Sequence, residues 1–204
     1  MNYMRLKHFL DFVIALMSLV ALMPVFLIVY IGSSLSTKSH GIYVQKRIGY
    51  CGRTFLILKF KSMFDLKVNT DFHTSIDNPR ITTFGKIIRR TKLDEIPQLI
   101  NIIRGEMSFV GPRPDVPGYA DRIDLETTYL CKVKPGITCS ASLFFRDEEL
   151  ILKSVPNKKK FNDEVIWPIK VELNNEYAKN LSLKGDLVLI FQTLGFLESE
   201  RFKV

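Results

Sequence analysis

The stretch KLDEIPQLINIIRGEMSFVGPRP, from Lys92 to Pro114, joins two adjacent carboxylates to an apolar helical pattern, a glycine and a Pro-Arg-Pro turn. We place Asp94 at the amino-terminal cap of a helix that ends at Gly105. Pro97 then falls in the first turn, where its missing N–H is tolerated. The apolar residues of this helix recur at helical spacing and predict one buried face: Ile96, Leu99, Ile100 and Ile103.

The charges around the Asp-Glu pair suggest more than helix capping, although capping alone is one interpretation of Asp94 and Glu95. Arg89 and Arg90 precede the pair, and the rigid Pro-Arg-Pro turn carries Arg113. Arginines gathered near the start of a helix are typical of a phosphate site. Carboxylates beside a phosphate indicate either a divalent cation such as Mg²⁺ or a carboxylate that attacks phosphorus. Both alternatives stay open from these residues.

Phe9 to Ile31 form an apolar run, broken by Asp11 and Ser18, that is long enough to cross a bilayer as a helix. A signal peptide is the weakest of three interpretations, because no cleavage motif follows the run. A spanning helix and a re-entrant helix, which enters and leaves by the same face, are the other two. Pro24 inside the run and basic residues on both flanks favour the re-entrant helix. The basic flanks are Arg5, Lys7, His8, Lys38, His40, Lys46 and Arg47.

The whole chain predicts an α+β fold that is mostly helical, with a membrane-inserted helix at 1–36 and a second, water-exposed domain at 37–204. The stretch from Ile42 to Leu58 is predicted as a short β-hairpin with Gly49 and Gly52 in its turn. The other predicted elements are a polar loop at 65–79, a helix capped by Thr82 or Thr83, a helix within 116–130, a loop at 132–138 and two closing helices within 157–197.

Charge and cysteine content narrow the partners of the chain. The formal net charge is +8 and the pI is about 9.4, which favours an anionic partner: nucleic acid, anionic lipid or a phosphorylated substrate. The three cysteines, Cys51, Cys131 and Cys139, form no close CxxC pair and have no histidine cluster beside them. A disulfide framework and a zinc site are therefore not expected.

Three motifs carry a resemblance to a known family: VQKRIGYCGRTFLILKFKSM at 44–63, NPRITTFGKIIRRTKLDEIPQLINIIRGEMSFVGPRP at 78–114 and KVKPGIT at 132–138. They resemble the bacterial sugar transferases, which are monotopic polyprenol-phosphate phosphoglycosyl transferases. The similarity runs from the apolar segment to about Thr138. The length of the chain is similar to that of the small, single-domain members.

The resemblance implies a two-step phosphoryl transfer at the membrane face. Asp94 would attack the β-phosphate of a UDP-sugar and release UMP. The aspartyl-phosphosugar intermediate would then pass to a polyprenol phosphate such as undecaprenyl phosphate. Glu95 would help to hold Mg²⁺, and the positions of Lys59, Arg89 and Arg113 match family contacts to phosphate and nucleotide. This reaction would start the assembly of a capsular or exopolysaccharide, an O-antigen or a glycoprotein glycan.

The resemblance also implies a re-entrant helix kinked at Pro24 in the bacterial inner membrane, with the catalytic domain facing the cytoplasm. The expected partners are a UDP-sugar, a polyprenol phosphate and membrane lipid; a homodimer is left open and no nucleic acid is expected. The chain departs from the family patterns at four positions: Met23, Lys61, Cys139 and Ser142. The last two lie in a region that shapes the sugar pocket. The sugar is therefore left open, with a lean towards an N-acetylated amino-deoxy sugar.

Two other function classes remain. A basic, membrane-attached protein that binds nucleic acid or anionic lipid fits the charge, but it gives no reason for the spacing of Asp94, Glu95 and Arg113. A membrane phosphatase or pyrophosphatase would use the same aspartate for hydrolysis. UMP release that depends on polyprenol phosphate would separate transfer from hydrolysis.

Overall fold

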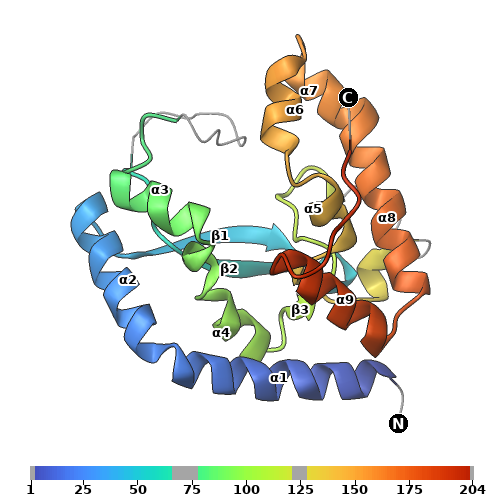
Figure 1. Cartoon of the computed structure of the whole chain (residues 1–204), viewed down its shortest axis with the longest axis horizontal. Coiled ribbons are helices and arrows are strands. Elements are labelled where there is room, and N and C mark those ends of the chain that lie inside the picture. The colour runs from blue at the N-terminus through green and yellow to red at the C-terminus, as the bar shows by residue number, and fades with distance from the viewer. Residues whose placement is uncertain (1–2, 66–77, 121–127, 203–204) are drawn as a thin grey trace. The chain divides into compact units, whose positions relative to one another are not determined.

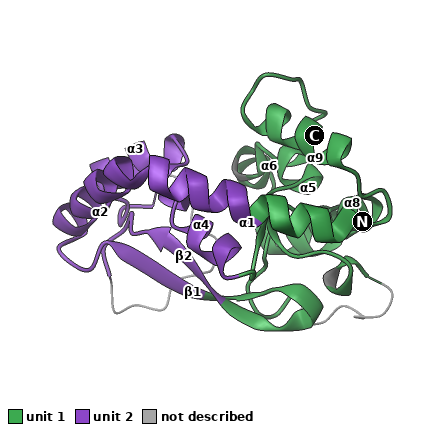
Figure 2. Ribbon diagram, turned by 90° about the horizontal axis from the view of Figure 1, so that it is seen from below, with its two compact units in different colours: residues 1–11, 46–55, 105–204 green, residues 12–45, 56–104 purple. Residues whose placement is uncertain are grey.

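The computed structural model describes residues 3–65, 78–120 and 128–202 of the 204. The chain divides into two compact units, each assembled from separate stretches of sequence (Figure 2). The first unit comprises residues 1–11, 46–55 and 105–204, and the second comprises residues 12–45 and 56–104. The proposed boundary between residues 36 and 37 stays a prediction.

The apolar run near the amino terminus forms two helices, α1 (Tyr3–Ala21) and α2 (Met23–Thr37), which are bent by 68° where they meet (Figure 1). Pro24 is the second residue of α2, so the predicted kink beside this proline is confirmed. Among the described residues, no single helix is long and apolar enough to cross a membrane. The bent pair meets that requirement only when its two helices are taken together.

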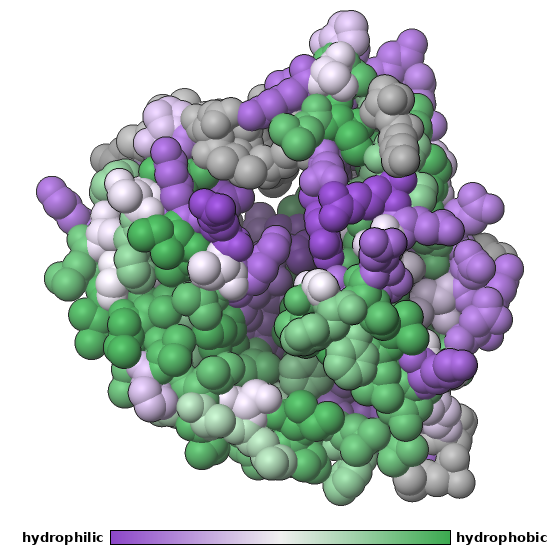
Figure 3. Space-filling model, viewed as in Figure 1, coloured by the Kyte–Doolittle hydropathy of each residue, from purple (hydrophilic) through white to green (hydrophobic). Residues whose placement is uncertain are grey.

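Large apolar side chains on α1 and α2 are exposed, and hydrophobic residues gather over these two helices in the space-filling view (Figure 3). The exposed side chains of this apolar surface include Phe9, Phe12, Ile14, Leu16, Met17, Val20, Leu27, Ile28, Ile31 and Leu35. An exposed apolar surface of this extent is unusual for a soluble monomer and marks an interaction surface.

The predicted β-hairpin is confirmed. Strands β1 (Ile42–Ile48) and β2 (Thr54–Phe60) form a two-stranded sheet, and a 3₁₀ turn, η1 (Tyr50–Gly52), lies between them. Gly52 has φ of +69°, a left-handed conformation that glycine adopts without steric cost. The turn therefore uses one of its two predicted glycines in the role that only glycine fills easily.

Helix α3 (Thr83–Arg90) starts where the sequence indicated. The Thr82 hydroxyl accepts a 2.8 Å hydrogen bond from the N–H of Gly85, which satisfies one of the free donors at the helix start. Val29 of α2, Phe60 of β2 and Ile88 of α3 form the buried core of the second unit. This core holds α3 so that its basic carboxyl end leads into the Asp-Glu pair.

The predicted helix from Asp94 to Gly105 is wrong in its first turns. A 3₁₀ turn, η2 (Leu93–Glu95), comes first, and helix α4 (Gln98–Ile103) begins after Pro97. Asp94 therefore lies inside η2 and caps no helix, because the chain enters this turn through Lys92 with φ of +59°. The predicted end is confirmed, since Gly105 follows α4 with φ of +76°.

The predicted buried face of this helix is also largely wrong. The buried residues of α4 are Gln98, Leu99, Asn101 and Ile102. The reason lies in Asn101, whose carboxamide accepts from Leu58 N (3.0 Å) and donates to Leu56 O (2.8 Å). Both partners belong to β2, so hydrogen bonding to a strand decides which face of α4 is buried.

The first unit contains a second sheet that the sequence did not predict. Strands β3 (Ser108–Val110) and β4 (Gly136–Thr138) pair in parallel, with Ser108 opposite Gly136 and Val110 opposite Thr138. The prediction of a loop at 132–138 is therefore wrong at its carboxyl end. A Cβ on Gly136 would lie 2.2 Å from the backbone nitrogen of Gly111, so this approach requires glycine.

The carboxyl-terminal part of the first unit is helical, and the two predicted closing helices are confirmed. Its elements are η4 (Tyr129–Cys131), α5 (Ser140–Phe144), α6 (Glu148–Ser154), α7 (Lys158–Phe161), the π-helical η5 (Asn162–Ile166), α8 (Trp167–Lys179) and α9 (Leu183–Thr193). Of the predicted helix within 116–130, residues 121–127 lie outside the described part, and the described ends contain a turn that leads to a 3₁₀ position at Ala120 and the start of η4. Residues 66–77 of the predicted polar loop lie outside the described part as well.

Candidate active site

The Asp-Glu pair lies on η2, directly after the basic end of α3. Helix α3 ends with Arg89 and Arg90, and the left-handed Lys92 turns the chain into η2. Arg89 is partly buried, whereas Arg90 is exposed. Two carboxylates therefore follow a cluster of positive side chains within one short turn of backbone.

Glu95 is paired with a lysine from the hairpin. Its side chain is 10% exposed, and Lys59 Nζ lies 3.0 Å from Glu95 Oε1. Lys59 belongs to β2, which the core of the second unit fixes beside the site through Phe60. The structure thus brings together two residues that the sequence analysis had assigned to metal and phosphate binding.

Asp94 differs from its neighbour. Its Oδ1 atom is buried and has no hydrogen-bond partner among the described residues. Burial, followed by the negative charge of Glu95, raises the pKa of the Asp94 carboxyl; Lys59, Lys92 and Arg89 act in the opposite direction. A buried carboxylate oxygen without a partner is costly, so this atom is placed to meet a ligand or a reacting group.

Arg113 belongs to the first unit and is exposed. It lies in the loop from Gly111 to Pro114, which follows β3 and is held by its backbone. Gly136 N–H donates to the carbonyl of Pro112 at 2.9 Å, and the Arg47 guanidinium donates to the carbonyl of Pro114 at 3.2 Å. The guanidinium of Arg113 therefore projects from a turn whose two prolines are both anchored.

A small cavity lies beneath this turn. It is lined by Ile48, Gly49, Pro112, Arg113, Pro114, Asp115, Ala120, Tyr129, Val133 and Pro135. Burial raises the pKa of the Asp115 carboxyl to about 6, although the charges of Lys170, Arg47 and Arg113 oppose the shift. The turn thus carries a basic group at the surface and a titratable acid below it.

In a comparison with known families, the model of the bacterial sugar transferase family matches residues 2–199. The chain belongs to this family. The membership confirms the family that the three sequence motifs indicated.

Three curated proteins that are similar to this chain are named for exopolysaccharide production or for sugar transfer to a lipid carrier. The exopolysaccharide production protein ExoY of Sinorhizobium fredii is 33% identical over 92% of this chain and 83% of its own length. The UDP-galactose-lipid carrier transferase of Erwinia amylovora is 33% identical over 93% of this chain and 40% of its own length. The UDP-glucose:undecaprenyl-phosphate glucose-1-phosphate transferase of Xanthomonas campestris is 33% identical over 82% of this chain and 36% of its own length.

The site of this sugar transferase fits a hard divalent cation in two respects. Mg²⁺ commonly takes one or two protein carboxylates together with substrate phosphates, and Asp94 and Glu95 can supply them. The Lys59 ammonium beside Glu95 shows that the position accommodates positive charge. Within residues 3–65, 78–120 and 128–202, no cluster of three or more His, Cys, Asp or Glu side chains could hold a metal. The adjacent carboxylates of Asp94 and Glu95 are the donors that could share a cation with substrate phosphates.

The sequence analysis assigned no functional role to two residues, Gln98 in the second unit and Arg47 in the first. Gln98, at the start of α4, is 1% exposed, and its amide nitrogen lacks a hydrogen-bond partner within the described residues. Arg47 anchors the Pro-Arg-Pro turn through Pro114. Gln98 follows Asp94 by four residues, a spacing that places two residues on the same face of a helix, so the sequence offered a signal for it. The role of Arg47 depends on a contact between distant parts of the chain and had no local signal.

Proposed function

We propose that this sugar transferase moves a sugar-1-phosphate from a UDP-sugar to undecaprenyl phosphate and releases UMP, with Asp94 as the nucleophile. The observation that carries the proposal is the buried Oδ1 of Asp94, which has no hydrogen-bond partner among the described residues and lies under the charges of Glu95, Lys59 and Arg89. The names of the relatives support the substrate classes, since they include a lipid carrier and undecaprenyl phosphate.

In the first step, a carboxylate oxygen of Asp94 attacks the β-phosphorus of the UDP-sugar. A bond forms between this oxygen and phosphorus, and the bond from phosphorus to the bridging oxygen breaks. UMP leaves with the electron pair. The raised pKa of Asp94 favours attack because a more basic carboxylate is the better nucleophile, provided that it is ionised. Lys59 and Arg89 are placed to offset the charge of the phosphates.

In the second step, a phosphate oxygen of undecaprenyl phosphate attacks the same phosphorus. The acyl-phosphate bond to Asp94 breaks, the carboxylate is regenerated, and the product is a polyprenyl diphosphate sugar. Arg113, from the anchored Pro-Arg-Pro turn, contacts phosphate oxygens during transfer. The balance needs no oxidant, reductant or added proton donor.

Glu95 would hold Mg²⁺ in this reaction, with Asp94 as the neighbouring carboxylate. The bound cation would neutralise charge on the diphosphate. Lys59, which pairs with Glu95 in this structure, would then be available to the phosphates. This assignment rests on the donor set of the site and on the positive charge that it already accommodates.

The apolar surface of α1 and α2 supports a place at the inner membrane, where a polyprenol acceptor is found. We place the bent pair in the cytoplasmic leaflet as a re-entrant helix, with the catalytic residues facing the cytoplasm. Exposed apolar side chains on both helices suit a lipid environment, and the basic flanks favour a cytoplasmic position for both ends.

The test is a single-turnover measurement with purified protein in detergent. With a UDP-sugar but no acceptor, we expect about one UMP per protein and an added sugar-phosphate in the intact mass. Addition of undecaprenyl phosphate should remove the adduct. The screen should include UDP-glucose, UDP-galactose and UDP-N-acetylated sugars.

The matched variant is Asp94→Asn, which is nearly isosteric and disturbs no cap, since Asp94 makes no capping bond. It should fold with a thermal stability no lower than that of the wild type, because the raised pKa of Asp94 means that the ionised carboxyl is unfavourable in the folded protein, and it should give neither adduct nor UMP. Continuous UMP release without acceptor would indicate hydrolysis instead, and normal turnover by Asp94→Asn would exclude the covalent mechanism.

A further inference from the structure

The first turns of α1 carry a buried polar stripe. Tyr3, Lys7 and Asp11 recur every four residues and so lie on one face of the helix. Lys7 is 5% exposed and Asp11 is 8% exposed, whereas Phe9 between them is 63% exposed. The charged residues therefore face the protein and the apolar residue faces outwards, the reverse of an ordinary surface helix.

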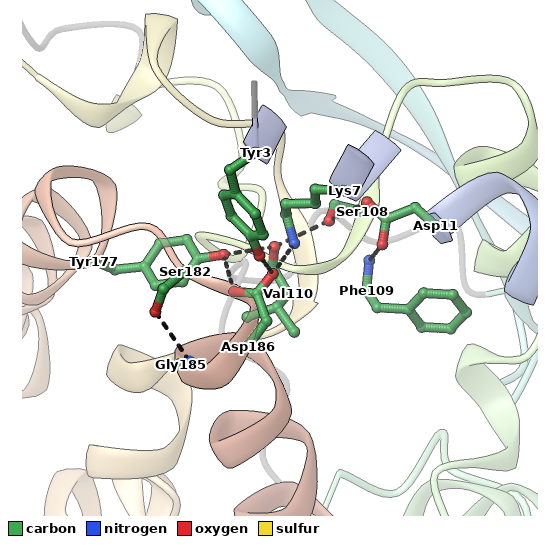
Figure 4. Close-up of polar contacts among 10 residues, drawn as sticks. All are labelled: Tyr3, Lys7, Asp11, Ser108, Phe109, Val110, Tyr177, Ser182, Gly185 and Asp186. Carbon is green, nitrogen blue, oxygen red and sulfur yellow. Dashed lines mark hydrogen bonds and ion pairs between the residues drawn. The ribbon is translucent and has the colours of Figure 1, made fainter. Parts of the chain in front are cut away.

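The stripe meets a buried carboxylate from the other end of the chain. Asp186, in the first turn of α9, accepts hydrogen bonds from the hydroxyls of Tyr3 and Tyr177, each at 2.7 Å, and forms an ion pair with Lys7 (Figure 4). Burial and the nearby Asp186 raise the pKa of Tyr177, so its hydroxyl keeps its proton and acts as a donor. Asp186 thus joins α1, α8 and α9.

Asp11 joins the same stripe to strand β3. Its Oδ2 accepts a 2.7 Å hydrogen bond from the Ser108 hydroxyl, and its Oδ1 accepts from the backbone N–H of Phe109 at 3.3 Å (Figure 4). The one carboxylate in the apolar run therefore has two partners on β3. This contact accounts for an acidic residue that the sequence analysis could only record as an interruption.

The two halves of the network converge on the carbonyl oxygen of Val110, the last residue of β3. The single hydroxyl proton of Tyr177 is shared between Asp186 Oδ1 at 2.7 Å and this oxygen at 3.1 Å, which links α8 to β3. The Ser108 hydroxyl, on β3 itself, lies 3.0 Å from the same oxygen. The next residue, Gly111, donates its N–H to the carbonyl of Thr138 on β4 at 2.9 Å. Arg113 follows Gly111 by two residues. The network therefore contacts β3 directly before the Pro-Arg-Pro turn.

Stability alone is a weak reason for such a network. A buried ion pair gains little over well-packed apolar side chains, because desolvation opposes the attraction. Its directional bonds do, however, specify one position of the strand. We propose that Asp11, Tyr177 and Asp186 are positioning residues that fix β3 and, through it, the loop that carries Arg113. This role rests on the proposed function, in which Arg113 contacts phosphate.

The test is a double-mutant cycle on kcat/KM for the UDP-sugar, using the full chain in detergent. Tyr177→Phe removes one hydroxyl and should lower kcat/KM about 5- to 10-fold, the range of one lost hydrogen bond. Tyr119→Phe is the matched control, because the Tyr119 hydroxyl donates to Asp163 at 2.9 Å in the same unit and outside the network. The control should keep wild-type activity.

The decisive comparison uses Arg113→Ala, which alone should lower kcat/KM by about 10²-fold or more. If the network acts through Arg113, Tyr177→Phe should lower kcat/KM less than 2-fold further in that background. An equal loss in both backgrounds would overturn the positioning role while leaving the function of Arg113 intact. Full activity of Arg113→Ala would remove the phosphate role of Arg113 and this inference together.

A second variant covers the case in which Tyr177→Phe does not fold. Ser108→Ala removes the hydroxyl that bonds to Asp11 on the same strand, and its loss of kcat/KM should depend on Arg113 in the same way. Failure of both variants to fold would show that the network serves folding, and would overturn the inference.

Discussion

At the scale of single residues, two adjacent carboxylates have different surroundings. Glu95 Oε1 is paired with Lys59, whereas Asp94 Oδ1 is buried without a partner in the described structure. Two neighbouring acids with different surroundings commonly have different roles. The sequence could predict the pair and its basic neighbours from spacing. It could not predict which carboxylate meets Lys59, because that contact joins β2 to η2 across the fold.

The first prediction concerns Glu95 and the cation. EDTA should stop UMP release and added Mg²⁺ should restore it. Glu95→Gln should raise the Mg²⁺ concentration for half-maximal activity at least about tenfold, because a neutral amide is a poorer ligand for a hard cation. Glu164→Gln is the control, since Glu164 is exposed and only loosely paired with Lys160 at 4.0 Å. Full activity in chelator would contradict the metal role of Glu95.

The second prediction concerns Asp115 beneath the Pro-Arg-Pro turn. Burial raises the pKa of this carboxyl from 3.8 to about 6, so the folded protein binds its proton more tightly than the unfolded chain. The free energy of unfolding should therefore fall as pH rises through this window and stay lower above it. Asp115→Asn, which cannot ionise, should be more stable than the wild type at pH 7.5, with the difference lost at pH 4.

Thermal or urea unfolding of both proteins across this pH range is the measurement. The comparison between them isolates Asp115 from the other carboxyls that titrate over the same range. If the free energies of unfolding of the two proteins changed in parallel with pH, the pKa of the Asp115 carboxyl would be the same in the folded and unfolded protein.

At the scale of elements, the sequence predicted a helix start or a turn correctly where a single capping side chain or a single glycine determines it. The Thr82 cap and the Gly52 turn are such cases. Tertiary contacts decided the rest. Asn101 is fully buried because it bonds to the backbone of β2, and β4 is only three residues long, too short for an alternating pattern to predict it.

The third prediction tests this reversal of the α4 face. Asn101→Ala should lower the free energy of unfolding by about 2–3 kcal/mol, because it removes a fully buried side chain and both of its hydrogen bonds, to Leu58 N–H and to Leu56 C=O of β2. Ile103→Ala should cost less, about 1 kcal/mol, since Ile103 is only partly buried. Denaturant unfolding in detergent measures both. If Ile103→Ala lowered the free energy of unfolding more than Asn101→Ala, the buried face of α4 would be the one that the apolar spacing predicted.

At the scale of the whole molecule, the sequence predicted the bent apolar pair well, because a proline within an apolar helical run either kinks the helix or starts a new one. The bend of 68° is present, but the membrane side of each end is a separate matter. Two topologies follow from one bent pair. In a re-entrant arrangement both ends of the pair lie on the cytoplasmic side, and in a spanning arrangement the amino terminus lies outside.

The last prediction separates these topologies with two single-cysteine variants, Asn2→Cys and Ser39→Cys, in a background without Cys51, Cys131 and Cys139. An impermeant maleimide should label neither variant in intact cells and both after the membrane is opened, which also shows that each thiol is reactive. Pro24→Leu removes the proline beside the bend and should let some molecules straighten, so that Asn2→Cys becomes labelled in intact cells. Labelling of Asn2→Cys, but not of Ser39→Cys, in intact cells with Pro24 present would mean that the pair spans. The active residues all follow Ser39 in the chain, so they would still face the cytoplasm, where UDP-sugars are available.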